Sequence, residues 1–492
     1  MNGTVLILLG TVAVFGASLG ASFHFDDYTL FSDPTVTSPS GWWSVWQLWR
    51  TRPLTYFTFW LNYQLGGQSA VGYHAVNLAL HLLAVWILNG ILVDLVGRRA
   101  ALIATAVFAL HPIQTEPVAY VWARAILLAT VFCLISLRAW LDGRYLAAAV
   151  WFSLALISKE ECVTFPLFLF LIHRRAILPA AGMLCLSAAA TGRVFLALKH
   201  LHVVGAGAAA GISPINYFAT QGTVVLRYLR LLLLPYGFTF DPDIPVVGDL
   251  RGWIAWVIIL GIAVLLWRFY RHGLWFAAAL VLLAPSSTIF PAADLAADRR
   301  LYLPMVAFAT LIGLLLAELG RVRMVIILVI LALATISVFR TQVWLTERAL
   351  WAEAVERSPK KVRPRLLLAR ASDTETALRL LTVAEELAPG DPKPFIEKGA
   401  RLMEVDLPDL ALAEFDRAML LTPKDPMVLN NRGAALAKLG RREDAIAAFS
   451  AALFIDPCWA SARANLQSAG ITYPTPCSLA HGSGLAPNRP IY

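Results

Sequence analysis

The stretch AVNLALHLLAVWILNGILVDLV, residues 75–96, decides the class of fold. It holds one charged side chain, Asp94, in a run as long as the ~20 residues that a membrane-spanning helix needs. Arg98 and Arg99 follow almost directly, and clustered basic residues are typical of the cytoplasmic end of such a helix. The stretch therefore predicts a transmembrane helix whose end near Arg98 faces inside.

The composition extends this prediction to much of the chain of 492 residues, because 58% of them are hydrophobic and only 15% are charged. These values exclude a soluble globular enzyme, a disordered chain and a collagen-like fibre. Residues 1–340 contain 22 basic and 14 acidic side chains, whereas the shorter part 341–492 contains 19 and 18. We therefore predict a membrane domain over 1–340 and a soluble part after it. The soluble part is nearly neutral, which argues against a nucleic-acid partner.

Apolar segments divide the membrane domain into about eleven predicted spans. We interpret the first segment as an uncleaved anchor, since it has no positively charged start and further spans follow. Residues 213–235 are apolar enough to span but carry Arg227 and Arg230, and we interpret them as a re-entrant or interfacial helix. The predicted spans are 3–23, 75–96, 100–110, 124–141, 145–157, 161–172, 176–198, 251–268, 273–290, 302–319 and 322–340.

Charge sets the predicted orientation, because basic residues favour the cytoplasmic side. With the N-terminus inside, every short inside loop is basic, and the soluble part faces the periplasm or an equivalent lumen. The basic residues of these inside loops are Arg98, Arg99, Arg144, Arg174, Arg175, Arg268, Arg271, Arg321 and Arg323.

Prolines at Pro389, Pro423 and Pro457 recur every 34 residues, which is the period of tetratricopeptide (TPR) repeats. The signature positions recur with them. Residues 341–471 are therefore predicted to form a TPR array that binds a peptide or protein, or alternatively a packing or dimerisation module. Residues 472–492, rich in Pro, Ser and Gly, predict a disordered tail. The recurring positions are Gly399, Ala411, Phe415 and Ala418 in one repeat and Gly433, Ala445, Phe449 and Ala452 in the next.

Ionisable residues in the outer loops are the candidates for chemistry. Asp26 and Asp27 directly follow the first span and are suited to act as a general base toward a hydroxyl or as a pair of metal ligands, so a divalent cation stays an open alternative. The other outer loops add the acid Glu116 and several cations, which suit an anionic lipid phosphate. Alternatively, these are only solvated loop charges. The cations are Arg124, Lys159, Arg299 and Arg300.

Several motifs along almost the whole chain resemble one known family. The chain is similar to the transmembrane-and-TPR-containing O-mannosyltransferases and their bacterial relatives, which are GT-C glycosyltransferases. The motifs are FDDYTLFSDP (25–34), RPLTYFTFWLNYQLGG (52–67), GYHAVNLALH (72–81), HPIQTEPVAYVWARAILLA (111–129), SKEE (158–161), SPINYFATQG (213–222) and DRRLYLP (298–304).

The resemblance implies a polyprenyl-phosphate-linked sugar as donor and an inverting transfer of one mannose-like hexose to a hydroxyl. Ser or Thr of an exported protein is the implied acceptor. It implies a catalytic role for Asp26 and Asp27, one of them as base, and for Glu116. His74 and His111 match family motifs and are candidates for substrate binding, or alternatively interfacial histidines. Substrate binding is also assigned to Arg124, Lys159, Arg299 and Arg300.

The expected fold is thus all-α: a polytopic GT-C-type membrane domain followed by a TPR α-solenoid. The array is shorter than in eukaryotic members, and Ala123 precedes Arg124 where those members usually have glycine. Both features favour a bacterial inner-membrane enzyme with its site on the periplasmic side and an undecaprenyl-type carrier. The expected partners are the bilayer, the lipid-linked donor and an acceptor protein held by the TPR surface. The alternatives are a non-catalytic TPR scaffold or a GT-C enzyme that acts on a glycolipid or envelope glycan.

Overall fold

The computed structural model describes residues 3–47, 50–173, 176–200 (198–200 as backbone alone), 211–287, 292, 294–319 and 323–472. These residues form helices and no strand, as the sequence predicts. The chain divides into two compact units, Met1–Leu350 and Trp351–Tyr492. This division falls slightly beyond the predicted boundary at 340/341. The predicted tail lies outside the described residues, apart from Thr472.

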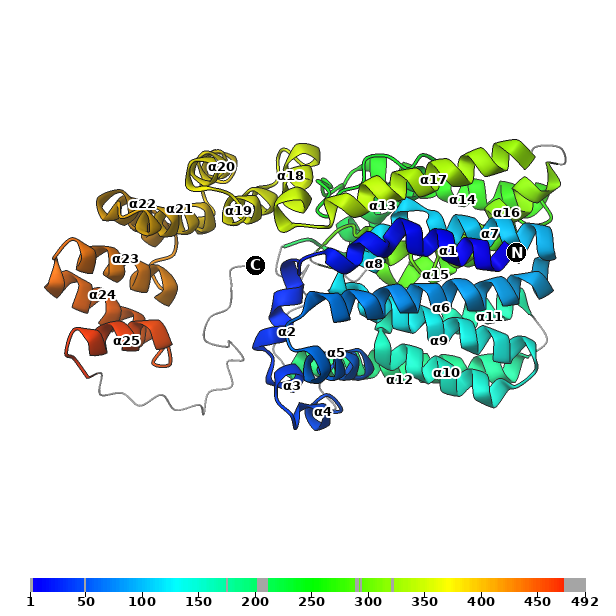
Figure 1. The fold of residues 1–492 in the computed structure, drawn as a ribbon, viewed down its shortest axis with the longest axis horizontal. Coiled ribbons are helices and arrows are strands. Elements are labelled where there is room, and N and C mark those ends of the chain that lie inside the picture. The colour runs from blue at the N-terminus through cyan, green and yellow to red at the C-terminus, as the bar shows by residue number, and fades with distance from the viewer. Residues whose placement is uncertain are drawn as a thin grey trace. The chain divides into compact units, whose positions relative to one another are not determined.

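The first unit is built from helices of very different lengths (Figure 1). Its α-helices are α1 (Gly3–Phe15), α2 (Thr29–Ser32), α3 (Pro34–Thr37), α4 (Gly41–Ser44), α5 (Pro53–Gly66), α6 (Ala70–Val96), α7 (Arg98–Leu110), α8 (Thr115–Ala119), α9 (Arg124–Leu141), α10 (Tyr145–Ser158), α11 (Phe165–Ile172), α12 (Ile177–His200), α13 (Pro214–Leu233), α14 (Leu250–Phe269), α15 (Leu274–Leu283), α16 (Met305–Glu318) and α17 (Arg323–Val343). Its 3₁₀ helices are η1 (Gly16–Gly20), η2 (Phe25–Tyr28), η3 (Pro112–Gln114), η4 (Val121–Ala123), η5 (Glu160–Cys162), η6 (Ala284–Ser286) and η7 (Asp298–Leu301).

Six helical stretches of the described residues are long and apolar enough to cross a membrane, so the predicted count of about eleven is not supported. The other predicted segments form helices too short to span alone, such as α10 and α16 with 14 residues each and α11 with 8. Breaks in the sequence end them early: α7 stops before His111 and Pro112, because proline has no N–H to continue the helix. The six stretches are Gly3–Gly20, Ala70–Val96, Val121–Leu141, Ile177–Ala197, Leu250–Phe269 and Arg323–Val343.

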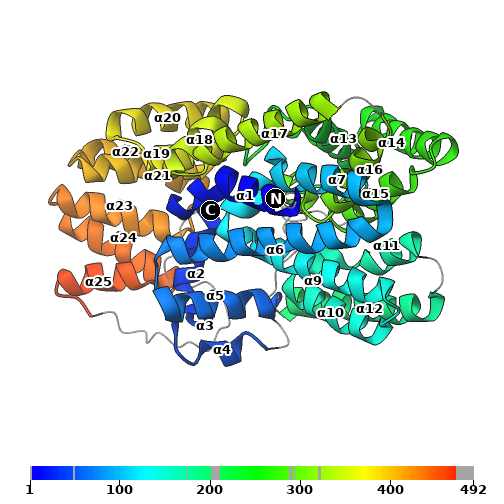
Figure 2. The ribbon, with the colours of Figure 1, turned by 45° about the vertical axis from the view of Figure 1, so that its right-hand side comes forward.

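Two short helices of this membrane unit, α7 and α16, are buried by their neighbours. α7 is buried on nearly every side and packs against α6 and α16. A Cβ atom at Gly313 of α16 would lie 2.6 Å from the Cβ atom of Ala104 on α7, so glycine is what permits the approach. α1 runs along α6 and α7 in both views (Figures 1 and 2). Protein therefore surrounds most of α7 and α16, which are too short to span on their own.

Two long helices define the two ends of the membrane unit. α6 has 27 residues and so rises roughly 40 Å. α6 and α9 start side by side, because the Arg124 guanidinium at the start of α9 donates to Asn77 near the start of α6. Arg98 and Arg144 follow the far ends of these helices. The candidate residues of the outer loops therefore lie at the end away from these basic residues.

The second unit, called the repeat unit below, is a stack of helix pairs. Asp391 and Asp425 start the first helices of two repeats, where their carboxylates accept hydrogen bonds from the backbone N–H two residues on. The first helices α19, α21, α23 and α25 contact one another in order, whereas α20, α22 and α24 make no comparable contacts with each other within residues 351–472. The first helices thus line the inner, concave side of the array. Its helices are α18 (Glu347–Arg357, which crosses the division), α19 (Val362–Arg370), α20 (Thr374–Leu387), α21 (Pro392–Glu404), α22 (Pro408–Leu421), α23 (Pro426–Lys438), α24 (Arg442–Ile455) and α25 (Ala460–Ser468).

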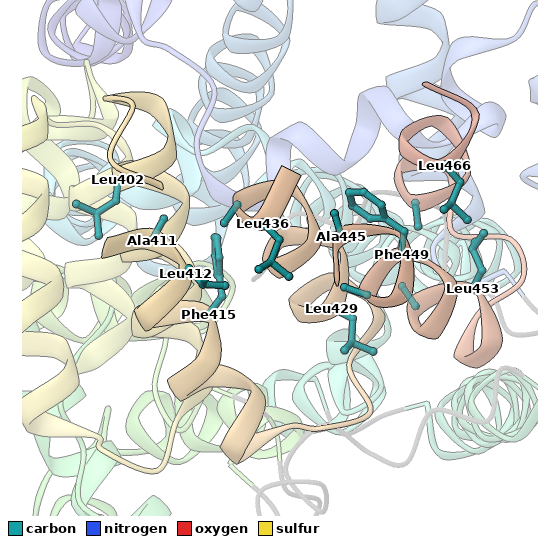
Figure 3. Packing of buried hydrophobic residues seen from close by; sticks show 14 residues of the cluster. Leu402, Ala411, Leu412, Phe415, Leu429, Leu436, Ala445, Phe449, Leu453 and Leu466 are labelled. Atoms are coloured by element: carbon teal, nitrogen blue, oxygen red, sulfur yellow. The ribbon is translucent and has the colours of Figure 1, made fainter. Parts of the chain in front are cut away.

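Glycine at the signature position lets the two helices of a repeat approach. A Cβ atom at Gly399 would lie 2.5 Å from Cε1 of Phe415, and one at Gly433 would lie 2.6 Å from Cε1 of Phe449. Both phenylalanines are buried in one apolar cluster that runs through the repeats (Figure 3). The spacing of the TPR signature therefore reflects this contact between ring and backbone.

Replacing Gly433 by valine should destabilise the repeat unit by about 1–3 kcal/mol, because the added methyl groups overpack the Phe449 ring. Thermal unfolding of the full chain in detergent, followed by circular dichroism, would measure the change. Gly390→Ala is the matched control, since its added Cβ meets no atom within 4 Å. Equal unfolding midpoints for the two variants would contradict this account of the signature glycine.

Candidate active site

The acidic pair lies on η2, where the chain turns after the first span. Phe25 adopts a positive φ of 46°, which non-glycine residues rarely adopt and which is frequent at functional sites. Asp27 is fully buried and accepts hydrogen bonds from the backbone N–H groups of His24 (3.0 Å) and Trp122 (2.7 Å). Asp26 is only half-buried. Two adjacent carboxylates thus have different surroundings.

Burial raises the pKa of Asp27 well above its ordinary value, although its hydrogen bonds from His24 and Trp122 act in the opposite direction. A carboxyl group enclosed in this way joins η2 to η4 and holds the loop. Asp26 is the less buried member of the pair.

Asp26 is linked to a buried ion pair through Tyr120. The Tyr120 hydroxyl donates a hydrogen bond of 3.0 Å to Oδ2 of Asp26. The guanidinium carbon of Arg299 lies 5.8 Å from the centre of the Tyr120 ring, within the range of a cation–π contact. Nη1 of Arg299 lies 2.7 Å from Oε1 of Glu116. The structure therefore brings together Asp26, Glu116 and Arg299, which the sequence predicted from three separate loops.

The charges of this cluster favour a protonated Tyr120 and a charged Arg299. Burial, followed by the nearby Asp26 and Asp27, raises the pKa of Tyr120 well above its ordinary value, so the hydroxyl stays a donor. Burial alone would lower the pKa of Arg299, but Glu116, Tyr120 and Asp294 together more than offset this and hold that pKa above its ordinary value. The site thus keeps a fixed cation near the half-buried carboxylate.

The third outer loop adds the cation Lys159 and contacts a second cation, Arg52, of the first outer loop. Nζ of Lys159 lies 3.5 Å from Oε2 of Glu161, and Nε of Arg52 donates to Glu160 at 2.9 Å. Burial lowers the pKa of Lys159, and the positive charges of Arg52 and Arg299 act in the same direction. The pairing with Arg52 holds the pKa of Glu160 at about 2 despite its burial.

Two arginines hold the last outer loop in place, Arg300 of the loop itself and Arg227 of α13. Nη2 of Arg300 donates to the carbonyl oxygen of Asp294 at 2.8 Å, and Nη1 of Arg227 on α13 pairs with Asp298 at 2.6 Å. Arg300 therefore positions the loop that presents Arg299. The segment 213–235, predicted to be a re-entrant or interfacial helix, forms α13 and is not among the six spanning candidates.

Arg124 does not join this cluster. It is fully buried, and its guanidinium donates to Asn77 Oδ1 at 3.0 Å and to the carbonyl oxygens of Thr58 at 3.2 Å and Tyr73 at 3.0 Å. These contacts hold α5, α6 and α9 together. We therefore leave Arg124 out of the proposed donor site, because the protein itself uses its donor groups.

The two predicted histidines are also part of the framework. His74 is buried in α6, with its ring centre 6.5 Å from that of Phe23 in a stacked contact. Nδ1 of His111 accepts from the Ile113 N–H at 3.1 Å, and Nε2 donates to the carbonyl oxygen of Leu232 at 3.2 Å. Neither ring lies in the cluster of carboxylates and cations described above.

Sequence reasoning does not find two residues of the cluster, Arg52 and Tyr120. Both stand in quoted motifs on the outer side, and this position is the only signal that points to them. Arg52 has a positive φ of 57°, so two of the three non-glycine residues with positive φ in the described part lie at this end of the membrane unit. The described residues contain no group of three His, Cys, Asp or Glu arranged to hold a metal ion.

The chain is similar to known proteins along much of its length. The chain is 26% identical over 416 residues to "Protein O-mannosyl-transferase F38B6.6" of Caenorhabditis elegans, a match that covers 74% of this chain and 58% of that protein. It is 25% identical over 463 residues to "Protein O-mannosyl-transferase TMTC4" of Homo sapiens, with 72% of this chain and 62% of that protein covered. The chain thus spans about 60% of the length of these curated relatives. No family model matches the chain.

Among solved structures, a thermophilic TPR protein of Thermus thermophilus is 19% identical and covers 33% of this chain and 89% of its own. The TM-score of 0.23 is too low to bear on the fold. The assignment of the repeats therefore depends on their period of 34 residues and on the packing of their glycines.

The neutral, buried side chains of His24 and His111 should each contribute a stability to the membrane unit that is lost as the pH falls from about 6.5 to about 4. Burial lowers the pKa of both His24 and His111 from 6.5 to about 4. In this window the unfolded chain binds protons that the folded protein excludes, so unfolding is favoured, and the stabilisation is complete above pH 6.5. Thermal unfolding midpoints measured across this window test the sign of the effect.

His111→Asn should make this pH dependence shallower, because the Asn carbonyl replaces Nδ1 as acceptor for Ile113 and does not titrate. Equal pH dependence of the unfolding midpoints of the wild type and His111→Asn would refute the assignment.

Proposed function

We propose that the chain transfers one mannose-like sugar from a polyprenyl-phosphate donor to a hydroxyl group of a protein. The observation that carries this proposal is the link from the half-buried Asp26 through Tyr120 to Arg299 and Glu116. It places a candidate base, which an acceptor hydroxyl requires, near a fixed cation, which a lipid phosphate requires. The similarity to two proteins named as O-mannosyl-transferases supports the sugar and the protein acceptor.

In the proposed reaction, Asp26 accepts the proton of the acceptor hydroxyl as its oxygen attacks the anomeric carbon. The bond between that carbon and the phosphate oxygen breaks, and the lipid phosphate leaves with the electron pair. One displacement inverts the configuration at the anomeric carbon. Asp27 holds the loop, because its enclosed carboxyl group is bound by two backbone N–H groups.

The cations of two outer loops are the proposed site for the donor phosphate. Arg299 offers a planar guanidinium that suits phosphate oxygens, and Lys159 offers a point charge. Glu116 orients Arg299 at a distance of 2.7 Å and thus acts as a positioning residue. Arg300 fixes the same loop through the carbonyl oxygen of Asp294.

We further propose that the enzyme lies in a bacterial inner membrane with this site on the periplasmic side and an undecaprenyl-type carrier. Arg98, Arg99 and Arg144 follow the ends of α6 and α9 opposite the site. Basic residues at that end favour its location in the cytoplasm. The repeat unit is then available to an exported acceptor protein.

Asp26→Asn should reduce sugar transfer by about 10²–10⁴-fold, the usual contribution of a general base. Transfer of radiolabelled mannose from synthetic polyprenyl-phosphate mannose to a Ser/Thr peptide, by the purified protein in detergent, measures this loss. Asp243→Asn removes an exposed carboxylate of another outer loop and serves as the control. Full activity in Asp26→Asn, Asp27→Asn and the double variant would overturn the assignment of the base.

Tyr120→Phe should lower kcat by about tenfold and move the acidic limb of the pH–rate profile to higher pH. The hydroxyl donates to Asp26 at 3.0 Å, which favours the ionised carboxylate. Without it the pKa of Asp26 rises, and a higher pH is needed to ionise the base. A lowered kcat with an unmoved profile would show that Tyr120 acts only through packing.

A further inference from the structure

A cleft on the convex side of the repeat unit lies between two successive second helices, α20 and α22. Its volume is about 480 Å³, and residues of α20, α21 and α22 line it. Because the first helices line the concave side of the array, this cleft lies away from the concave face. Its lining includes Glu385, Glu386, Phe395, Arg417, Leu420 and Leu421.

A network of buried charges borders this cleft. Nζ of Lys398 lies 3.1 Å from Oε1 of Glu385 and 3.1 Å from Oε1 of Glu414. Nη1 of Arg417 lies 3.0 Å from Oε2 of Glu414 and 3.5 Å from Oε2 of Glu385. Both carboxylates are buried, and a buried ionic network gains little stability over apolar packing of the same volume. Stability alone therefore does not account for these charges.

The next repeat stacks without this network. Its second helix α24 packs against α23 around the same signature glycine and phenylalanine, Gly433 and Phe449. The four charges are thus not needed for the stacking of the helices. One repeat later, the positions of Glu385, Lys398, Glu414 and Arg417 hold Met419, Arg432, Ala448 and Ala451.

The network leaves one buried acceptor unused. Lys398 donates its hydrogen bond to Oε2 of Glu385, and Oε1 of Glu385 accepts none from the described residues although Nζ lies equally close to it. Burial, with the like charge of Glu414, raises the pKa of Glu385 despite the nearby cations. With Glu386, three carboxylates face two cations here, so the cleft keeps a net negative charge.

Apolar side chains complete the cleft. The ring of Phe395 is 3% exposed and already holds the Arg417 guanidinium, whose carbon lies 4.4 Å from the ring centre. Leu420, in contrast, is 82% exposed at the edge of the cleft. A single free oxygen of Glu385 suits the point charge of an ammonium group better than the fork of a guanidinium. The cleft therefore fits an aliphatic chain that ends in an ammonium group and has apolar neighbours.

We propose that this cleft between α20 and α22 binds a lysine side chain from an apolar segment of a partner protein, with its ammonium group paired to Glu385. The methylene groups of the lysine lie against Phe395, and its apolar neighbours cover Leu420. The exposed leucine favours a protein segment over a free amine, which has no apolar neighbours to offer it. This second binding surface is separate from the concave side and does not depend on the proposed function.

The test measures the affinity of a fluorescein-labelled peptide, GSLKLSG, for the purified full chain in lipid nanodiscs by fluorescence anisotropy, with empty nanodiscs as the blank. A peptide with norleucine in place of lysine keeps the aliphatic chain but lacks the ammonium group, and it should bind at least about tenfold more weakly. Glu385→Gln should weaken binding of the lysine peptide by a similar factor. Unlabelled cadaverine, a free diamine, should compete at least about tenfold more weakly than the unlabelled peptide, because it lacks the leucines.

Two variants of exposed side chains provide a matched pair that does not disturb the fold. Leu420→Ala should weaken binding by about threefold or more, because it removes the apolar contact. Phe454→Ala is the control, since Phe454 holds the same position one repeat later, is 84% exposed and has no such network beside it. Equal affinity of the lysine and norleucine peptides, wild-type affinity in Leu420→Ala, weaker binding in Phe454→Ala, equally strong competition by cadaverine, or no binding to the wild type would each overturn the proposal.

Discussion

The buried guanidinium of Arg124 is the contact on which the rest of the candidate site depends. It binds Asn77 of α6 and two backbone carbonyl oxygens, and its charge lies 4.5 Å from the centre of the Phe59 ring. A buried cation is costly unless its donors are satisfied, so these groups must be in place when the helices pack. The described residues offer it carbonyl and amide oxygens and aromatic faces, and no carboxylate within ion-pair distance.

A chain of hydrogen bonds leads from Arg124 to the loop that carries Asp26. The amide nitrogen of Asn77 donates to the carbonyl oxygen of Tyr120 at 3.0 Å, and the hydroxyl of Tyr120 donates to Asp26. Each of these hydrogen bonds fixes the position of one polar group on the next residue of the chain of contacts. The position of the proposed base therefore follows from the packing of α6 against α9, and the positive φ of Phe25 is maintained by contacts outside its own turn.

The sequence reveals the acidic pair and the repeats, because these depend on residue type and period. It does not reveal that Arg124 faces inward. An arginine at the start of a helix looks the same in the sequence whether its guanidinium binds a ligand or donates to three buried oxygen atoms of the protein, as it does here. Its partner Asn77 is 47 residues away, and only packing joins the two. The number of spans is overestimated for a related reason: apolar segments such as α11 owe their composition to burial in protein, and hydropathy does not separate protein from lipid.

The outer cations are already paired, and this bears on how a phosphate would bind. Burying Arg299 or Arg52 without a carboxylate would cost several kcal/mol, so the pairs with Glu116 and Glu160 belong to the fold. Among Arg52, Lys159 and Arg299, Lys159 has the weakest ion pair, because its carboxylate partner lies 3.5 Å away. In the proposed reaction, the charge that develops on the leaving phosphate would therefore gain most beside Lys159.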